Sequence, residues 1–227
     1  MYRLPNDQQR HAIVGATGSG KTQYALWELS NRNFNRMPWV VYNFKSDESI
    51  DSIPGSKHIE IEEIPEKPGI YVAHPLPRDE SKVEDHMWGI WERGHTGIYV
   101  DEGYMIGRNN EAFRALLTQG RSRHIPMLVL SQRPVWMDRF VFSESEYLQM
   151  FRLQDPDDIK KHFGRYIPQF PRNVSRPVNL THRLPEYHSY YYDVGNDTIH
   201  VVKPVPDIRT INSIFARRFD AQRRRAV

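Results

Sequence analysis

GATGSGKT, the stretch from Gly15 to Thr22, fits the pattern G-x-x-x-x-G-K-[ST] at every specified position. Residues 10–14 before it read as a short buried strand, and residues 22–29 after it carry apolar side chains at helical spacing. Glycines let such a loop bend around a phosphate, with its N–H groups at the positive end of the helix dipole. Because loop, lysine, hydroxyl and flanking elements coincide, we favour a nucleoside triphosphate site over a glycine-rich turn without a ligand.

Two side chains of this loop have expected roles in binding ATP and Mg²⁺, the two cofactors that the pattern implies. Lys21 should reach the β- and γ-phosphates, and the Thr22 hydroxyl should complete the Mg²⁺ shell. The residues expected to contact the nucleotide are Gly15, Ala16, Thr17, Gly18, Ser19, Gly20, Lys21, Thr22 and Gln23.

The composition indicates one large core with appendages. The chain has 227 residues, no cysteine and a formal net charge of +3, and its mean hydropathy is −0.68. The absence of cysteine excludes a disulfide framework and fits a reducing compartment. No apolar run approaches the length of a membrane span, and the first residues lack the apolar core of a signal peptide. We therefore expect no membrane span, although peripheral membrane contact stays open.

Strand-like and helix-like segments alternate along the chain, which predicts an α/β fold with a central, mostly parallel sheet flanked by helices. Residues 1–164 are expected to form the core, and residues 165–227 a C-terminal arm, β-hairpin and basic helix or tail packed on it. The expected strands are residues 10–14, 39–44, 69–73, 97–102, 126–132 and 147–153, and the expected helices 22–29, 81–93, 111–123 and a short one ending at Phe163. Residues 54–68 are expected to be mostly a surface excursion. A hairpin is predicted where residues 187–194 and 198–203 flank Gly195-Asn196-Asp197.

Two acids close the strand predicted at residues 97–102. Asp101 would support Mg²⁺, directly or through water, and Glu102 is placed to orient and deprotonate an attacking water. An Asp-Glu pair at a strand end can also be solvated surface, but the loop upstream favours the catalytic interpretation. The glutamate favours hydrolysis, because a kinase must exclude water.

Polar residues around the strand predicted at 126–132 supply two more candidates. Gln132 at its tip could hydrogen-bond the γ-phosphate and the nucleophilic water, although polar strand ends are common. Arg121 and Arg123 precede the strand and, in a ring, could reach a neighbour's nucleotide. Their alternative role is to complement a helix C-terminus.

This ordered set resembles the FtsK/HerA superfamily of hexameric DNA-pumping ATPases. The resemblance rests on Gly15–Thr22, on Val100-Asp101-Glu102, on Arg121 and on Leu130-Ser131-Gln132-Arg133-Pro134, and covers roughly residues 8 to 153. Cellular members usually have threonine where this chain has Ser131. Arg121 is preferred as the arginine acting in trans because members carry an arginine at that distance before the glutamine.

The short chain is most similar to the genome-packaging ATPases of tailless icosahedral phages with an internal membrane. That resemblance implies a RecA-like fold in which the strand of Gln132 lies between the loop strand and the acid strand. It also implies a ring, expected to be a hexamer, that drives double-stranded DNA into a preformed capsid. The expected partners are capsid or portal-vertex proteins, and the expected location is the virion vertex or the cytoplasm of an infected bacterial cell.

DNA contacts and a metal site are harder to find in the sequence. A translocase grips the phosphate backbone without reading bases, and Arg108 with Asn109, in the loop after the acids, is the candidate pore segment. The C-terminal arginines could bind DNA, anionic lipid or an acidic capsid surface, or remain solvated. The histidines show no ligand spacing, so no structural zinc is predicted.

Three other functions remain open. A morphogenesis or secretion motor for single-stranded DNA or protein would use the same machinery. A small-molecule kinase would need an acceptor pocket and lid, for which the sequence has no signature. A non-enzymatic capsid component would not need the intact set of Lys21, Thr22, Asp101 and Glu102.

Overall fold

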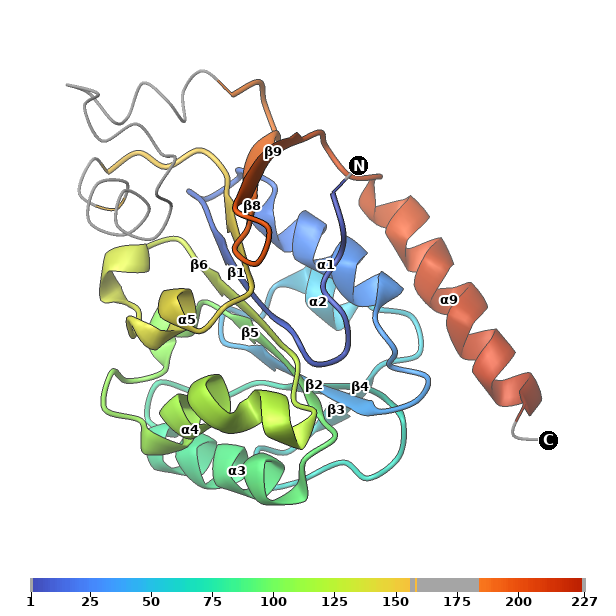
Figure 1. The fold of residues 1–227 in the computed structure, drawn as a ribbon. Coiled ribbons are helices and arrows are strands. Elements are labelled where there is room, and N and C mark those ends of the chain that lie inside the picture. The colour runs from blue at the N-terminus through green and yellow to red at the C-terminus, as the bar shows by residue number, and fades with distance from the viewer. Residues whose placement is uncertain (1, 156–157, 159–183, 226–227) are drawn as a thin grey trace.

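A nine-stranded sheet forms the centre of the molecule (Figure 1). The computed structural model describes residues 2–155, 158 and 184–225. The strand order is β3-β4-β2-β5-β6-β1-β7-β8-β9, and all pairs from β3 to β7 are parallel. Its strands are β1 (Arg10–Val14), β2 (Pro38–Asn43), β3 (Lys57–Ile59), β4 (Gly69–Ala73), β5 (Gly97–Asp101), β6 (Met127–Ser131), β7 (Tyr147–Met150), β8 (Ser189–Asp193) and β9 (Thr198–Val202).

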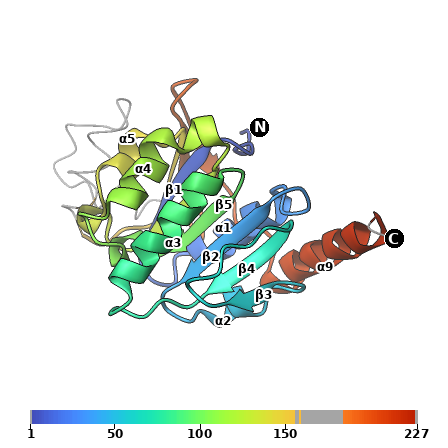
Figure 2. The ribbon, with the colours of Figure 1, turned by 90° about the horizontal axis from the view of Figure 1, so that it is seen from below.

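Helices cover both faces of this sheet (Figure 2). One face packs against α3 (Glu80–Arg93), α4 (Glu111–Gln119) and α5 (Phe140–Ser143), and the other against α1 (Lys21–Asn31), α2 (Glu48–Asp51) and α9 (Ile208–Arg225). Strand side chains alternate between these layers: Val40 and Tyr42 of β2 face α3 and α4, whereas Trp39 and Val41 face α1. Three short 3₁₀ helices, Gly103–Met105, Gly120–Arg123 and Pro134–Trp136, lie in the connections.

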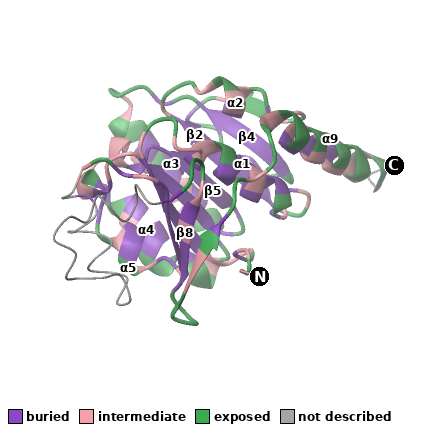
Figure 3. Cartoon of the chain, turned by 90° about the horizontal axis from the view of Figure 1, so that it is seen from above, coloured by how far each residue is buried: buried purple, intermediate pink, exposed green. Residues whose placement is uncertain are grey.

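The parallel strands are buried because both of their faces are covered (Figure 3). Every residue of β1, β2, β4, β5, β6 and β7 is buried, whereas the short edge strand β3 is mostly exposed. The predicted α/β architecture is confirmed, including the placement of β6 between β1 and β5. Because parallel strands point the same way, the residues after β1, β2, β5 and β6 meet at one edge of the sheet.

The predicted hairpin and basic helix are both present. β8 pairs antiparallel with β7 and with β9, so the hairpin extends the central sheet. Of the tyrosines at 190–192, Tyr191 and Tyr192 are buried and Tyr190 is partly exposed.

Helix α9 is held on the core by one face. Phe215 and Phe219 pack against Phe34, and Arg218 donates a hydrogen bond to the Ser30 carbonyl at 2.5 Å. The Arg218 guanidinium also stacks on the Phe34 ring at 4.6 Å from its centroid. The sequence left open whether the C-terminal arginines bind a partner or remain solvated. The contacts of Arg218 show that it docks α9 on the core.

Several predicted boundaries shift. The segment predicted as one helix from Glu111 to Arg123 ends at Gln119 and continues as the 3₁₀ helix Gly120–Arg123. The predicted surface excursion 54–68 contains β3. The short helix to Phe163, the irregular arm and the boundary between residues 164 and 165 fall outside the described residues. Within the part of the chain that is described, no helix combines the length and apolar character that a bilayer crossing requires.

Candidate nucleotide-binding site

The loop between β1 and α1 is anchored to the last residue of β6 and to the segment that follows β7. Gly15 N donates to the Ser131 carbonyl at 3.1 Å, and Ala16 N donates to the Arg152 carbonyl at 2.8 Å. Gly18 and Gly20 have φ angles of 73° and 97°, a left-handed conformation that glycine adopts without a steric cost. Gly20 is the N-cap of α1, so the loop delivers its amides to the start of that helix.

Gly15 is the tightest position of the loop. A Cβ there would lie 2.5 Å from Ser19 Oγ and 2.7 Å from Phe151 Cβ, which is closer than side-chain atoms can approach. The Ser19 hydroxyl is buried without a hydrogen-bond partner among the described residues. The loop is therefore compact and keeps an unused polar group, as a site built for an anion would.

The two acids lie directly opposite this loop. Asp101 ends β5 and is 2% exposed, and its Oδ1 is buried with no hydrogen-bond partner in the described chain. Burial, followed by the charge of Glu102, raises the pKa of Asp101 to about 7. A buried carboxylate oxygen that lacks a partner fits a divalent cation, which would supply the missing charge.

Glu102 faces the loop and not the solvent. Its backbone is left-handed, with φ 64° and ψ 67°, which turns the side chain out of the strand register. Oε1 lies 2.6 Å from Lys45 Nζ and 3.8 Å from Lys21 Nζ, and Oε2 accepts a hydrogen bond from Gln132 N at 3.1 Å. Glu102, the loop lysine and the β6 tip therefore converge.

Lys21 is buried against these acids. Burial lowers its pKa, while the charges of Glu102 and Asp101 act in the opposite direction. Thr22, the next residue on α1, is half-buried. Gln132 is the second link to the loop, because its Oε1 accepts a hydrogen bond from Thr17 Oγ1 at 2.7 Å.

Three other predicted residues lie away from this centre. Arg121 is exposed in the 3₁₀ helix before β6, and its backbone carbonyl accepts a hydrogen bond from His124 N at 3.2 Å. Arg108 and Asn109 are exposed in the loop after the acids. The Arg108 guanidinium donates to the Val135 and Trp136 carbonyls, in the segment that follows Gln132.

The sequence interpretation missed Lys45 and a pocket beside Gly20. Lys45 follows β2, and only the β2–β5 pairing brings it to Glu102. The pocket has a volume of about 220 Å³ and is lined by Gly20, Gln23, Tyr24, Phe151, Tyr187, Pro204 and Val205. Gln23 Nε2 donates to the Pro206 carbonyl at 2.8 Å, which joins α1 to the segment after β9. The sequence could not predict this cavity, because Tyr187, Pro204 and Val205 flank the β8–β9 hairpin and reach Gly20 only in the folded chain.

The fold and this constellation define a P-loop nucleoside triphosphatase. Comparison of the whole chain with known proteins then gives the family. The chain is 46% identical over 224 residues to the DNA packaging ATPase P9 of Enterobacteria phage PRD1, covering 98% of this chain and 97% of that protein. It therefore belongs to the family of phage DNA packaging ATPases, as the motifs predicted. No family model matches the chain.

Solved structures agree on the fold. The genome packaging NTPase B204 of Sulfolobus turreted icosahedral virus 2, in complex with AMPPCP, superposes with a TM-score of 0.67 at 19% identity, over 88% of this chain and 100% of that one. The cytoplasmic domain of the type VII secretion ATPase EccC of Thermomonospora curvata gives 0.60 at 15% identity, over 92% of this chain and 28% of that one. At these identities the likeness shows the shared fold alone.

Proposed function

We propose that this chain hydrolyses ATP to translocate double-stranded DNA into a preformed viral capsid. The observation that carries the hydrolytic part is the position of Glu102, buried and in contact with both Lys21 and the β6 tip. The DNA substrate and the capsid are supported by membership of the packaging ATPase family.

Binding of ATP and Mg²⁺ would give partners to two buried atoms that have none among the described residues, Ser19 Oγ and Asp101 Oδ1. The phosphates would lie on the loop amides, with Lys21 moving from Glu102 to the β- and γ-phosphates. Thr22 and Asp101 would hold Mg²⁺, which neutralises charge on those phosphates. The adenine base would enter the 220 Å³ pocket, where the ring of Tyr187, 48% exposed, offers a stacking surface.

Hydrolysis would depend on Glu102 as the general base. Its carboxylate would accept a proton from the attacking water while Gln132 reports the presence of the γ-phosphate. The Thr17–Gln132 hydrogen bond and the contact of Gln132 N with Glu102 already connect loop, sensor and base. Loss of the γ-phosphate would therefore change the hydrogen bonds of Gln132, at the end of β6.

Coupling to DNA would pass along the segment after β6. Arg108 is bonded to the carbonyls of Val135 and Trp136, so a shift of Gln132 would move the proposed DNA-contacting side chains Arg108 and Asn109. We propose that Arg108 and Asn109 contact the phosphate backbone of DNA and not its bases, which suits a motor that must move any sequence.

Assembly into a ring, which we propose to be a hexamer, would complete the site. Arg121 lies before β6, and the loop of the same chain lies after β1 at the other end of the strands, about 17 Å away for a strand of this length. This distance from the loop of its own chain supports our proposal that Arg121 serves a neighbouring copy. Arg123 is the weaker candidate because its guanidinium stacks on Trp91 at 3.8 Å from the ring centroid. Such a ring would act at a capsid or portal vertex, in the virion or the infected cell.

The test is phosphate release from ATP with and without double-stranded DNA, for wild type, Glu102→Gln and the exposed control Glu66→Gln. Glu102→Gln should still bind ATP but lose roughly 10²–10⁴-fold in turnover, whereas Glu66→Gln should behave as wild type. Stimulation by duplex DNA supports translocation. Stimulation only by single strands would favour the other morphogenesis motors, and phosphate transfer to a small acceptor would identify a kinase. Nucleotide binding without any turnover would indicate a structural capsid role.

A further inference from the structure

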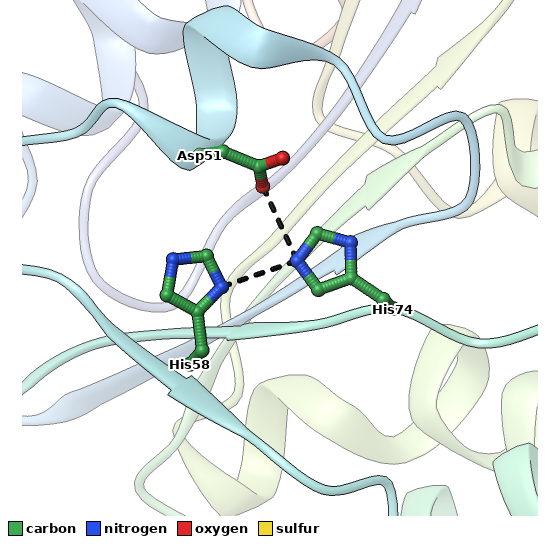
Figure 4. Close-up of side chains that lie close together, drawn as sticks. All are labelled: Asp51, His58 and His74. Carbon is green, nitrogen blue, oxygen red and sulfur yellow. Dashed lines mark hydrogen bonds and ion pairs between the residues drawn. The ribbon is translucent and has the colours of Figure 1, made fainter.

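Three side chains distant in the sequence converge at the β3–β4 edge of the sheet (Figure 4). Asp51 is the last residue of α2, His58 is the middle residue of β3, and His74 directly follows β4. His74 Nε2 lies 3.2 Å from His58 Nδ1 and 3.2 Å from Asp51 Oδ1. One ligand atom from each residue lies within 4.8 Å of the others.

Hydrogen bonds among Asp51 Oδ1, His58 Nδ1 and His74 Nε2 cannot satisfy all three atoms at once. A single hydrogen on His74 Nε2 cannot lie along both 3.2 Å lines, because Asp51 Oδ1 and His58 Nδ1 are separate acceptors. Moving the hydrogen to His58 Nδ1 turns the His74 lone pair toward the Asp51 carboxylate. A cation placed between the three atoms would accept all three lone pairs at once.

The spacing suits a transition metal. Zinc binds imidazole nitrogen at about 2.0–2.1 Å, so ligand atoms at two corners of a tetrahedron lie about 3.3 Å apart. Both distances from His74 Nε2 are close to that value. We propose that Asp51, His58 and His74 form a binding site for a divalent transition metal of the zinc class, with at least one position open to solvent.

A hydrogen bond from a buried side chain supports the carboxylate of Asp51. Asn43 is 1% exposed, and its Nδ2 donates to Asp51 Oδ1 at 2.9 Å. Its amide is itself fixed, because Asn43 Oδ1 accepts a hydrogen bond from Asp47 N at 2.9 Å. Carboxylates that ligate metals are commonly oriented by such a second hydrogen bond. Asn43 is also the register partner of Asp101, so the hydrogen bond to Asp51 comes from the strand next to β5.

The surroundings favour a cation. A cavity of about 460 Å³ opens beside His58 and His74, and acids outnumber bases along its wall. The acids are Glu60, Glu62, Glu63 and Asp79, and the bases are Arg78 and Lys82. The resulting negative potential would concentrate divalent ions near the two imidazoles.

A second histidine pair on the same chain provides a matched control. The rings of His95 and His124 stack at 4.8 Å with an interplanar angle of 10°, much as those of His58 and His74 do at 5.3 Å and 10°. In the described residues, no metal-type cluster with a carboxylate forms around His95 and His124. Stacked histidines alone should therefore not bind the metal.

The experiment measures Zn²⁺ and Co²⁺ binding to the full chain after EDTA treatment, without nucleotide and with millimolar Mg²⁺ present. Calorimetry gives the Zn²⁺ stoichiometry and affinity, and visible absorption reports Co²⁺ and its displacement by Zn²⁺. The variants are His58→Gln, His74→Gln and Asp51→Asn, with His95→Gln as the control. His58 and His74 are exposed, and Asp51→Asn keeps the acceptor for Asn43, so circular dichroism in EDTA should match wild type.

Wild type and His95→Gln should bind one Zn²⁺ per chain with a Kd that is roughly micromolar or tighter. The three site variants should each weaken binding by at least about tenfold. Zn²⁺ at a hundredfold excess over Kd should raise the Tm of wild type by about 5 °C. The proposal is overturned if wild type binds no Zn²⁺ below about 100 μM, or if the folded site variants bind it as wild type does.

Discussion

Replacing Asp101 by asparagine should stabilise the nucleotide-free protein at alkaline pH. Burial, and then the neighbouring charge of Glu102, raises the pKa of Asp101 from 3.8 to about 7. Its Oδ1 has no hydrogen-bond partner in the described residues to compensate. The folded chain therefore contains a carboxyl group that resists ionisation, whereas the same group ionises at its ordinary pKa when the chain unfolds.

The magnitude follows from the two pKa values. Between about pH 4 and pH 7 the folded state keeps a proton that the unfolded state has released, so stability falls as the pH rises through this window. Each unit of pKa difference corresponds to about 1.36 kcal/mol, which sets an upper limit of about 4 kcal/mol. Asparagine is neutral at every pH and removes this cost. With relaxation around the site we expect a gain of about 2–4 kcal/mol at pH 8 and about a third of that at pH 5.

The assay is urea unfolding in EDTA at both pH values, with Asp220→Asn on the exposed side of α9 as the control. Asp220→Asn should leave the unfolding midpoint unchanged at either pH. Adding Mg²⁺ and ATP should stabilise wild type more than Asp101→Asn, because the cation needs the ionised carboxylate. An Asp101→Asn midpoint equal to or below that of wild type at pH 8 would refute the reasoning, as would a gain that does not depend on pH.

Three further substitutions test the loop and the two helices packed behind it. Gly15→Ala should weaken ATP binding by roughly tenfold or more, because the added methyl would lie 2.7 Å from Phe151 Cβ. A fluorescence titration measures the affinity, and an unchanged value would argue against the compact loop. Glu28→Gln should lower the free energy of unfolding by about 3 kcal/mol, because fully buried Glu28 lies 2.6 Å from the buried Arg32 guanidinium, which would lose its partner charge. A loss below about 1 kcal/mol in urea unfolding would contradict a contribution from this ion pair. Phe219→Ala should cost about 3 kcal/mol and expose α9 to limited proteolysis; protection equal to wild type would show that α9 docks without this ring.

The catalytic motifs could be predicted because their information is local. A glycine loop before a helix and acids at a strand end carry their spacing within a few residues, and Gly15–Thr22 and Asp101 lie where the pattern put them. Gln132 was predictable for the same reason, as the residue after β6. The position of the Gln132 strand between the other two was also predicted, but from the family resemblance. The residues of a single strand do not determine which strands lie beside it.

The remaining parts of the sites depend on which strands are neighbours. Lys45 reaches Glu102 only because β2 pairs with β5, a crossover that no local pattern encodes. His58 and His74 are separated by a loop and lie together because the three-residue strand β3, read as a surface excursion, pairs with β4. Tyr187 joins the pocket beside Gly20 only once the hairpin has been added to β7.

The two lysines beside Glu102 offer a way for ATP binding to activate the proposed general base. Glu102 Oε1 lies 2.6 Å from Lys45 Nζ and 3.8 Å from Lys21 Nζ, so two cations share the charge of this carboxylate oxygen. The phosphates of ATP carry more negative charge than one carboxylate and would draw Lys21 toward the loop. Glu102 would then keep only Lys45, whose side chain is 38% exposed and can exchange its partner for solvent. Substrate binding itself would thereby release the base, which ties hydrolysis to an occupied phosphate loop.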